Sequence, residues 1–179
     1  MKFNKNILTA ALLTVGGFAA VSANAAVETS EFAITTTITA VCAVDATAAA
    51  INFTDIAAGT VGTDISNQQS AGDISVMCSN GAPYVINLST AGNSASTTGE
   101  GVMIGTSGND DTITYQLNST STGTVWGSTG ELGTEGNGVA GTGIGVTAPI
   151  LHSVYATITS STDVKQDTYT DTITASVIY

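Results

Sequence analysis

Apolar and polar residues alternate with a period of two along most of the chain after residue 30. The alternating apolar positions are Phe32, Ile34, Ile38 and Ala40; Ile74, Val76 and Cys78; Tyr84, Ile86 and Leu88; Ile113, Tyr115 and Leu117; and Val154, Ala156 and Ile158. Side chains on a strand point to opposite faces in turn, so each run predicts a strand with one buried face. Asn80-Gly81 lies between two of these runs and predicts a hairpin that joins them.

The last run is the clearest, and it extends to the final residue. Tyr169, Asp171, Ile173, Ala175, Val177 and Tyr179 share one face, and Thr170, Thr172, Thr174 and Ser176 share the other. No Gly or Pro interrupts the run, so it predicts one continuous strand.

Helical periodicity is missing after the N-terminal segment. Residues 92–145 are rich in Gly, Ser and Thr, which predicts long loops and short strands with Trp126 as their one large apolar anchor. The alanine run at 46–50 fits either one helical turn or a loop that crosses between sheets. Six to eight strands without helices predict an Ig-like antiparallel β-sandwich.

The N-terminal 25 residues predict a secretory signal peptide. Lys2 and Lys5 precede an apolar run over 7–21, and Ala23-Asn24-Ala25 matches the small-x-small pattern of a cleavage site. The alternative is a retained membrane anchor, but the run is short for a bilayer span. We expect residues 1–25 to be removed, leaving about 154 residues, the size of one domain.

Charge excludes two classes of partner. Arginine is absent, and the exported part carries Lys165 as its one cation against fourteen Asp and Glu residues. Nucleic acids and anionic lipids are bound by clustered cations, so we expect no nucleic-acid partner and no membrane insertion of the exported chain.

Cys42 and Cys78 are the only cysteines, and both follow the expected cleavage site. An even count in an oxidising compartment predicts one disulfide. A metal site is not expected, because His152 is the only histidine and the cysteines have no C-x-x-C spacing.

Catalytic chemistry has no support in the sequence. His152 has no G-x-S-x-G nucleophile motif to accompany it, and Asp110-Asp111 lies in a stretch of turn residues without EF-hand spacing. We therefore expect no enzyme activity, no cofactor and no metal.

Several segments in order resemble the Spore Coat Protein U domain family, which includes subunits of archaic chaperone–usher pili. Val41-Cys42-Ala43-Val44 and the ending Tyr169-Thr170-Asp171-Thr172 are the most specific; the other matching segments are 51–53, 72–81, 84–89, 115–117, 125–127 and 173–179. The resemblance implies an incomplete Ig-like antiparallel β-sandwich over 41–179 that is completed by donor-strand exchange.

The resemblance also implies partners and site residues. The partners are identical or related pilins, a periplasmic chaperone and an outer-membrane usher, and the protein is exported to the cell surface, where the pilus supports adhesion and biofilm formation. The donor residues, within the segment 26–40, are Phe32, Ile34, Thr36 and Ile38. The acceptor and chaperone-facing residues on the last strand are Ile173, Ala175, Val177 and Tyr179.

Two alternatives stay open on the sequence alone. Residues 30–41 also fit the domain's own first strand, since periodicity does not say which sheet a strand joins. A secreted coat protein or an adhesin with a carbohydrate-binding loop region would use the same sandwich.

Overall fold

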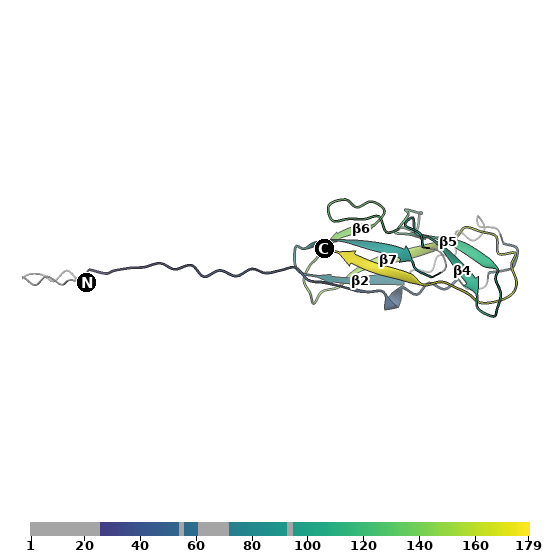
Figure 1. Ribbon diagram of the computed structural model, residues 1–179, viewed down its shortest axis with the longest axis horizontal. Helices are drawn as coiled ribbons and strands as arrows, with labels where there is room; N and C mark the ends of the chain where they lie inside the picture. The colour runs from purple at the N-terminus through teal and green to yellow at the C-terminus, as the bar shows by residue number, and fades with distance from the viewer. Residues whose placement is uncertain (1–25, 54–55, 61–71, 93–94) are drawn as a thin grey trace, which may run out of the picture. The chain divides into compact units, whose positions relative to one another are not determined.

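The computed structural model describes residues 26–53, 56–60, 72–92 and 95–179 (Figure 1). The expected signal peptide, residues 1–25, lies outside the described residues. The chain divides into two units, residues 1–37 and 38–179. In the second unit, the described residues form strands, loops and one short 3₁₀ helix, η1 (Thr47–Ala49).

Two antiparallel sheets make up the second unit. The larger has the order β1 (Cys42–Asp45), β2 (Gly72–Cys78), β7 (Ile150–Ile158), β5 (Thr112–Asn118), β4 (Glu100–Gly105) and β8 (Tyr169–Thr170). The smaller has the order β6 (Val139–Thr142), β3 (Pro83–Thr90) and β9 (Ile173–Ile178). This arrangement confirms the predicted all-β antiparallel sandwich.

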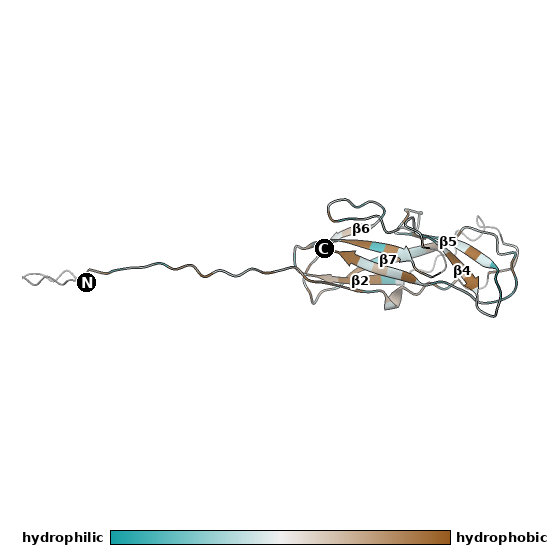
Figure 2. Cartoon of the chain, in the orientation of Figure 1, coloured by the Kyte–Doolittle hydropathy of each residue, from teal (hydrophilic) through white to brown (hydrophobic). Residues whose placement is uncertain are grey.

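The core lies between the two sheets and is formed by the alternating apolar positions (Figure 2). The most deeply buried apolar side chains are Trp126, Tyr84, Ile74, Ile86, Leu88, Leu117, Ile158, Val76 and Cys78. Fully burying one large apolar side chain contributes about 1.5–3 kcal/mol, so these positions account for much of the driving force for folding.

Trp126 fastens the long Gly-rich region to both sheets, as the sequence predicted. Its backbone N–H donates to the Leu117 carbonyl of β5 at 3.0 Å. Its indole Nε1 donates to the Ile86 carbonyl of β3 at 3.0 Å. The side chain is fully buried, so an amphipathic indole is both packed and satisfied at this position.

The hairpin predicted at Asn80-Gly81 is wrong. β2 pairs with β1 and β7, whereas β3 pairs with β6 and β9, so the turn carries the chain from one sheet to the other. Gly81 has φ +77°, and the Ala82 N–H donates to the Ser79 carbonyl at 3.0 Å. Strands in opposite sheets bury the same alternate positions in one core, and the alternation therefore could not distinguish the two connections.

The single last strand predicted from Tyr169 to Tyr179 is also wrong. β8 pairs with β4 in the larger sheet, and β9 pairs with β3 in the smaller one. The switch falls at Asp171, whose Oδ1 accepts the Thr172 N–H at 2.8 Å and whose Oδ2 accepts the Tyr115 hydroxyl at 2.7 Å. The first bond occupies a backbone N–H at the switch and the second ties the Asp171 side chain to β5, so the chain changes sheets here without a Gly or Pro.

The strand predicted between Phe32 and Ala40 does not form in this structure. Residues 26–41 have no regular secondary structure, and the domain's first strand is β1, which begins at Cys42. Phe32, Ile34 and Ile38 are each at least 84% exposed. A strand needs a neighbour to satisfy its backbone, and this segment has the alternating pattern of a strand but no strand partner among the described residues.

Candidate functional site

Each sheet has an edge strand that is paired on one side only, and these two edge strands lie on the same side of the sandwich. β9 is the edge of the smaller sheet and, among the described strands, pairs only with β3. β1 is the edge of the larger sheet and pairs only with β2 in the same described set. The two edge strands lie near each other without pairing. Unpaired N–H and C=O groups along such edges are a template for another strand.

The inward side chains of these edge strands are incompletely buried. Ile173, Ala175 and Val177 of β9 pack against the core but remain partly exposed, as do Cys42 and Val44 of β1. On the central strand β2, the equivalent inward residues are fully buried. The two strands share the same alternating pattern, but the inward side chains are fully buried on β2 and only partly buried on β9.

A cavity of about 420 Å³ lies behind the open part of the core. Both sheets line it, with Leu88, Ile173 and Ala175 from the smaller and Ile74, Leu117, Val154 and Ala156 from the larger. A folded core has few voids larger than a water molecule, so a hollow of this size leaves its apolar lining short of contacts. The cavity can take several apolar side chains.

η1 and the segment that follows it form one wall of the cavity. Ala49, Ile51 and Phe53 face the core from this wall and are partly buried. Thr47 is fixed by Asp45, whose Oδ1 accepts the Thr47 backbone N–H at 2.9 Å. This hydrogen bond lowers the pKa of the Asp45 carboxyl and holds the turn that leads from β1 into the wall.

The lining also includes a polar pair. Tyr115 and Asp171 both line it, and they are joined by the 2.7 Å hydrogen bond from the tyrosine hydroxyl to the carboxylate. Burial raises the pKa of Tyr115, and the hydrogen bond and charge of Asp171 raise it further, so the phenol stays protonated. The pair contributes polar groups that satisfy each other to a lining that also holds Thr47, Asn52, Thr170 and Thr172.

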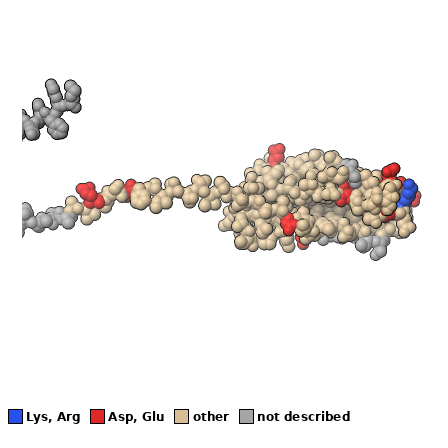
Figure 3. Space-filling view, turned by 60° about the horizontal axis from the view of Figure 1, so that its bottom comes forward, with Lys and Arg blue, Asp and Glu red and all other residues tan. Residues whose placement is uncertain are grey.

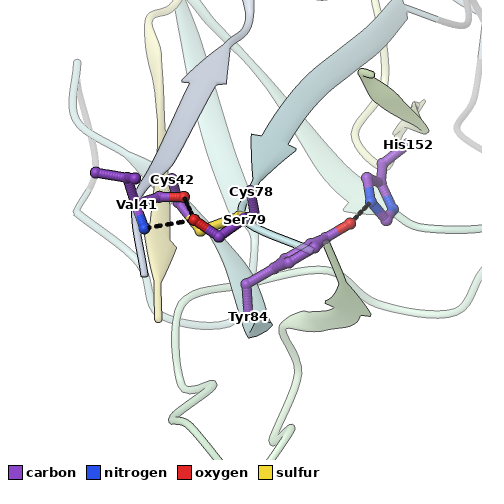
Figure 4. Close-up of a disulfide and its surroundings, with 6 residues drawn as sticks. All are labelled: Val41, Cys42, Cys78, Ser79, Tyr84 and His152. Atoms are coloured by element: carbon purple, nitrogen blue, oxygen red, sulfur yellow. Dashed lines mark hydrogen bonds between the residues drawn. A yellow bond between two sulfur atoms is a disulfide. The ribbon is translucent and has the colours of Figure 1, made fainter. Parts of the chain in front are cut away.

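A disulfide links the β1 edge to its neighbour (Figure 4). Cys42 and Cys78 are directly opposite in the β1–β2 register, and their sulfur atoms are 1.99 Å apart. This pairing confirms the disulfide predicted from the cysteine count. Two hydrogen bonds next to the disulfide also hold the chain before β1 against the end of β2. The Ser79 backbone N–H donates to the Val41 carbonyl at 2.9 Å, and the Ser79 Oγ accepts the Val41 N–H at 3.0 Å.

Sequence comparison places the chain in a known group. The family model of the Spore Coat Protein U domain matches residues 28–176. The chain belongs to the Spore Coat Protein U domain family. The match begins at residue 28, so the family pattern includes the exposed segment before β1 as well as the sandwich.

Structure comparison supports the same architecture. A chain in the crystal structure of the CsuC-CsuE chaperone-tip adhesion subunit pre-assembly complex, from archaic chaperone-usher Csu pili of Acinetobacter baumannii, matches with a TM-score of 0.53 and 16% identity. The match covers 80% of this chain and 41% of that chain, so this Spore Coat Protein U domain spans less than half of its length. At this identity the likeness shows the fold. No curated protein matches by sequence.

In this Spore Coat Protein U domain the predicted acceptor residues fall on one edge. Ile173, Ala175 and Val177 occupy the inward face of β9, and Tyr179 follows the strand with half of its side chain exposed. The predicted donor residues Phe32, Ile34, Thr36 and Ile38 are all exposed. Their role as donors stays a prediction.

Other residues of the cavity were missed by the sequence reasoning. Met103, Phe53 and the pair Tyr115 and Asp171 line it, although none was predicted as a site residue. One signal was present for Asp171, an acidic residue on the apolar face of the last run. A carboxylate at an inward position requires a polar partner, and Tyr115 is that partner.

The described residues contain neither a metal-binding cluster nor a membrane-spanning helix. Within the described ranges, no group of three or more His, Cys, Asp or Glu residues could hold a metal ion. The part of the chain that the structure describes contains no helix long and apolar enough to cross a membrane.

His152 is a structural partner of Tyr84 between the sheets (Figure 4). The Tyr84 hydroxyl lies 2.8 Å from His152 Nε2, and the two rings meet edge to face with centroids 5.8 Å apart. Burial lowers the pKa of His152 and raises the pKa of Tyr84. Both groups are therefore neutral at pH 7.

Protonation of His152 is expected to destabilise the fold. Its folded pKa lies below the unfolded value of about 6.5, so the unfolded chain binds the proton more tightly. The stabilisation is fully present above about pH 6.5 and is lost as the pH falls towards the lower folded pKa. Thermal melts between pH 7.5 and 5.5 should show the decline. A His152→Gln variant, which cannot titrate, should have a flatter profile, and an equally steep one would contradict this assignment.

Proposed function

We propose that this chain is a structural subunit of an archaic chaperone–usher pilus on a bacterial surface, supporting adhesion and biofilm formation. The observation that carries the proposal is the open side of the sandwich. There the unpaired edge of β9 and its partly exposed Ile173, Ala175 and Val177 lie beside an apolar cavity of about 420 Å³. Membership of the Spore Coat Protein U domain family supports the same function.

The open side is the acceptor for an extended segment of a neighbouring copy. Such a segment would pair its backbone with β9, the strand-addition mode of recognition, and would insert every second side chain into the core. β9 has six residues, which at about 3.3 Å per residue gives an edge of roughly 20 Å. That length accommodates the seven residues from Phe32 to Ile38 in an extended conformation.

The segment before β1 has the matching pattern. Phe32, Ile34, Thr36 and Ile38 fall on one face of an extended chain, and the three large apolar side chains are at least 84% exposed. Burying each would contribute about 1.5–3 kcal/mol, and the new ladder would satisfy the exposed backbone on both sides. Donation to a neighbour would therefore bury the exposed apolar side chains of this segment and pair the backbone of the β9 edge.

Assembly needs a temporary occupant of the same edge. A subunit with an open core would aggregate through it, so a periplasmic chaperone covers the β9 edge first and the usher exchanges it for the next subunit's segment. Residues 1–25 direct export and are removed, and the segment 26–40 then lies at the new N-terminus. The exchange uses binding and no covalent chemistry.

The test is the behaviour of surface-sheared material in detergent. Wild-type fibres should give a ladder of multimers without heating and a monomer band after boiling. A Phe32→Asp/Ile34→Asp variant should give monomer only, because each buried unpaired carboxylate would oppose insertion. Ala33→Asp is the matched control: it adds a charge to the same segment on the opposite face and should keep the ladder. A wild-type protein that is monomeric without heating would overturn the proposal.

A further inference from the structure

Three exposed apolar side chains gather at the end of the sandwich where the chain enters β1. Val41, Ile144 and Val146 are 56%, 58% and 55% exposed. We call them the exit patch. Ser79 lies between the two parts of the chain that carry the patch. It bonds Val41 through its backbone N–H and its Oγ, and its carbonyl occupies the space that a Cβ on Gly143 would need.

Backbone hydrogen bonds hold Ile144 and Val146 in place. The Gly143 N–H donates to the Ala82 carbonyl at 2.8 Å, and the Gly145 N–H donates to the Cys78 carbonyl at 3.0 Å. The Gly143 carbonyl in turn accepts the Gly81 N–H at 2.8 Å. A Cβ at Gly143 would collide with the Ser79 carbonyl, so only glycine allows this approach. These hydrogen bonds fix the backbone of the loop that carries Ile144 and Val146.

The three segments that carry the patch, 38–44, 77–84 and 139–149, contain no charged residue, although the whole chain carries a formal net charge of −11. The nearest carboxylate that bonds to them is Glu135, whose Oε1 accepts the Ala140 N–H at 3.4 Å. The described lysine, by contrast, lies among acidic residues elsewhere on the surface (Figure 3). Copies of an acidic chain repel one another over about one Debye length, roughly 8 Å at physiological salt. A contact between copies is least opposed where neither charge nor a long polar side chain intervenes.

The length of chain between the donor residues and β1 limits how far the accepting copy can lie from the patch. Ile38 is four residues before Cys42, and four extended residues span at most about 14 Å. A copy that accepts Ile38 into its core must therefore lie within that distance of Val41. We propose that the exit patch packs against this accepting copy and sets the angle between successive subunits, an inference that rests on the proposed function.

The contact is weak by itself and becomes populated through the tether. Three side chains make an interface far below the ~1,000 Å² that a stable free complex needs. Joining the copies through the inserted segment raises the effective concentration to about the millimolar range, where a weak contact forms. The patch would therefore stiffen a fibre without causing free subunits to associate.

Covalent footprinting of intact fibres by a carbene probe tests the contact. Leu132 and Val125 are matched references, because they are 47% and 42% exposed and lie outside the three patch segments. Contact within about 4.5 Å removes most of the exposed area, so labelling of Ile144 and Val146 should be about threefold or more lower than that of the references. Equal labelling of patch and references would overturn the inference while the detergent ladder, and the proposed function with it, still stands.

A charge variant gives a second readout. Ile144→Asp fibres should keep the heat-sensitive ladder, since the donor and acceptor side chains are unchanged, but should bend more in electron micrographs. Leu132→Asp fibres should match the wild type. Ile144→Asp fibres as stiff as the wild type would overturn the inference, and wild-type material that is monomeric before heating would overturn the proposed function.

Discussion

Replacing Cys42 and Cys78 together by alanine is expected to lower the free energy of unfolding by about 4 kcal/mol. The disulfide closes a loop across a sequence separation of 36, and the loop-entropy relation gives approximately that value for the constraint it places on the unfolded chain. β1 has only four residues and otherwise depends on β2 alone among the described strands. Urea denaturation of the double variant and the oxidised wild type measures the difference.

The control for this prediction is Ser79→Ala. It removes the Oγ contact with the Val41 N–H but leaves the disulfide intact, and it should cost about 1 kcal/mol. A double cysteine variant no less stable than Ser79→Ala would contradict the prediction. Because β1 borders the open side of the sandwich, the double variant should also accept a donor segment less well and give a shorter detergent ladder.

Replacing Trp126 by alanine is expected to destabilise the domain by about 3–5 kcal/mol. The indole is fully buried, and its loss leaves both a large cavity and an Ile86 carbonyl without its 3.0 Å donor. The long segment between β5 and β6 should become susceptible to proteolysis, because the variant loses the indole that packs this segment into the core and bonds it to β3. Chemical denaturation and limited proteolysis check the two effects.

Two milder variants bracket this result. Trp126→Phe keeps most of the apolar volume and loses the Nε1 donor, so its destabilisation should be clearly smaller than that of the alanine variant. Val125→Ala changes the neighbouring residue, whose side chain is 42% exposed, and should have little effect. Equal stability of Trp126→Ala and Val125→Ala would show that the indole does not anchor the region.

The strands were predictable because alternation reports burial directly. Ile74, Val76 and Cys78, or Val154, Ala156 and Ile158, lie at inward positions, and the structure buries all six. The connections were less predictable, since alternation does not specify the partner. Asn80-Gly81 is a common hairpin signal, yet here it joins strands in opposite sheets.

The candidate site was only partly accessible from the sequence. Ile173, Ala175 and Val177 were identified by alternation together with a family resemblance, but nothing in that pattern says that β9 is an edge. Edge position depends on which strands fail to pair, and this is a property of the whole topology. The cavity depends in the same way on residues as distant as Phe53, Met103 and Asp171, which no local pattern connects.

The position of the disulfide has a mechanical consequence. Cys42 is the first residue of β1, and it is bonded to Cys78 at the end of β2. Tension pulled through the N-terminal segment therefore enters β2 through a covalent bond before it can peel β1 away. β2 is flanked by β1 and β7, so its ladder hydrogen bonds to both strands must be broken before the load can extract it. In the proposed fibre, the disulfide would therefore keep β1 attached at the point where a pulled subunit would otherwise begin to unfold.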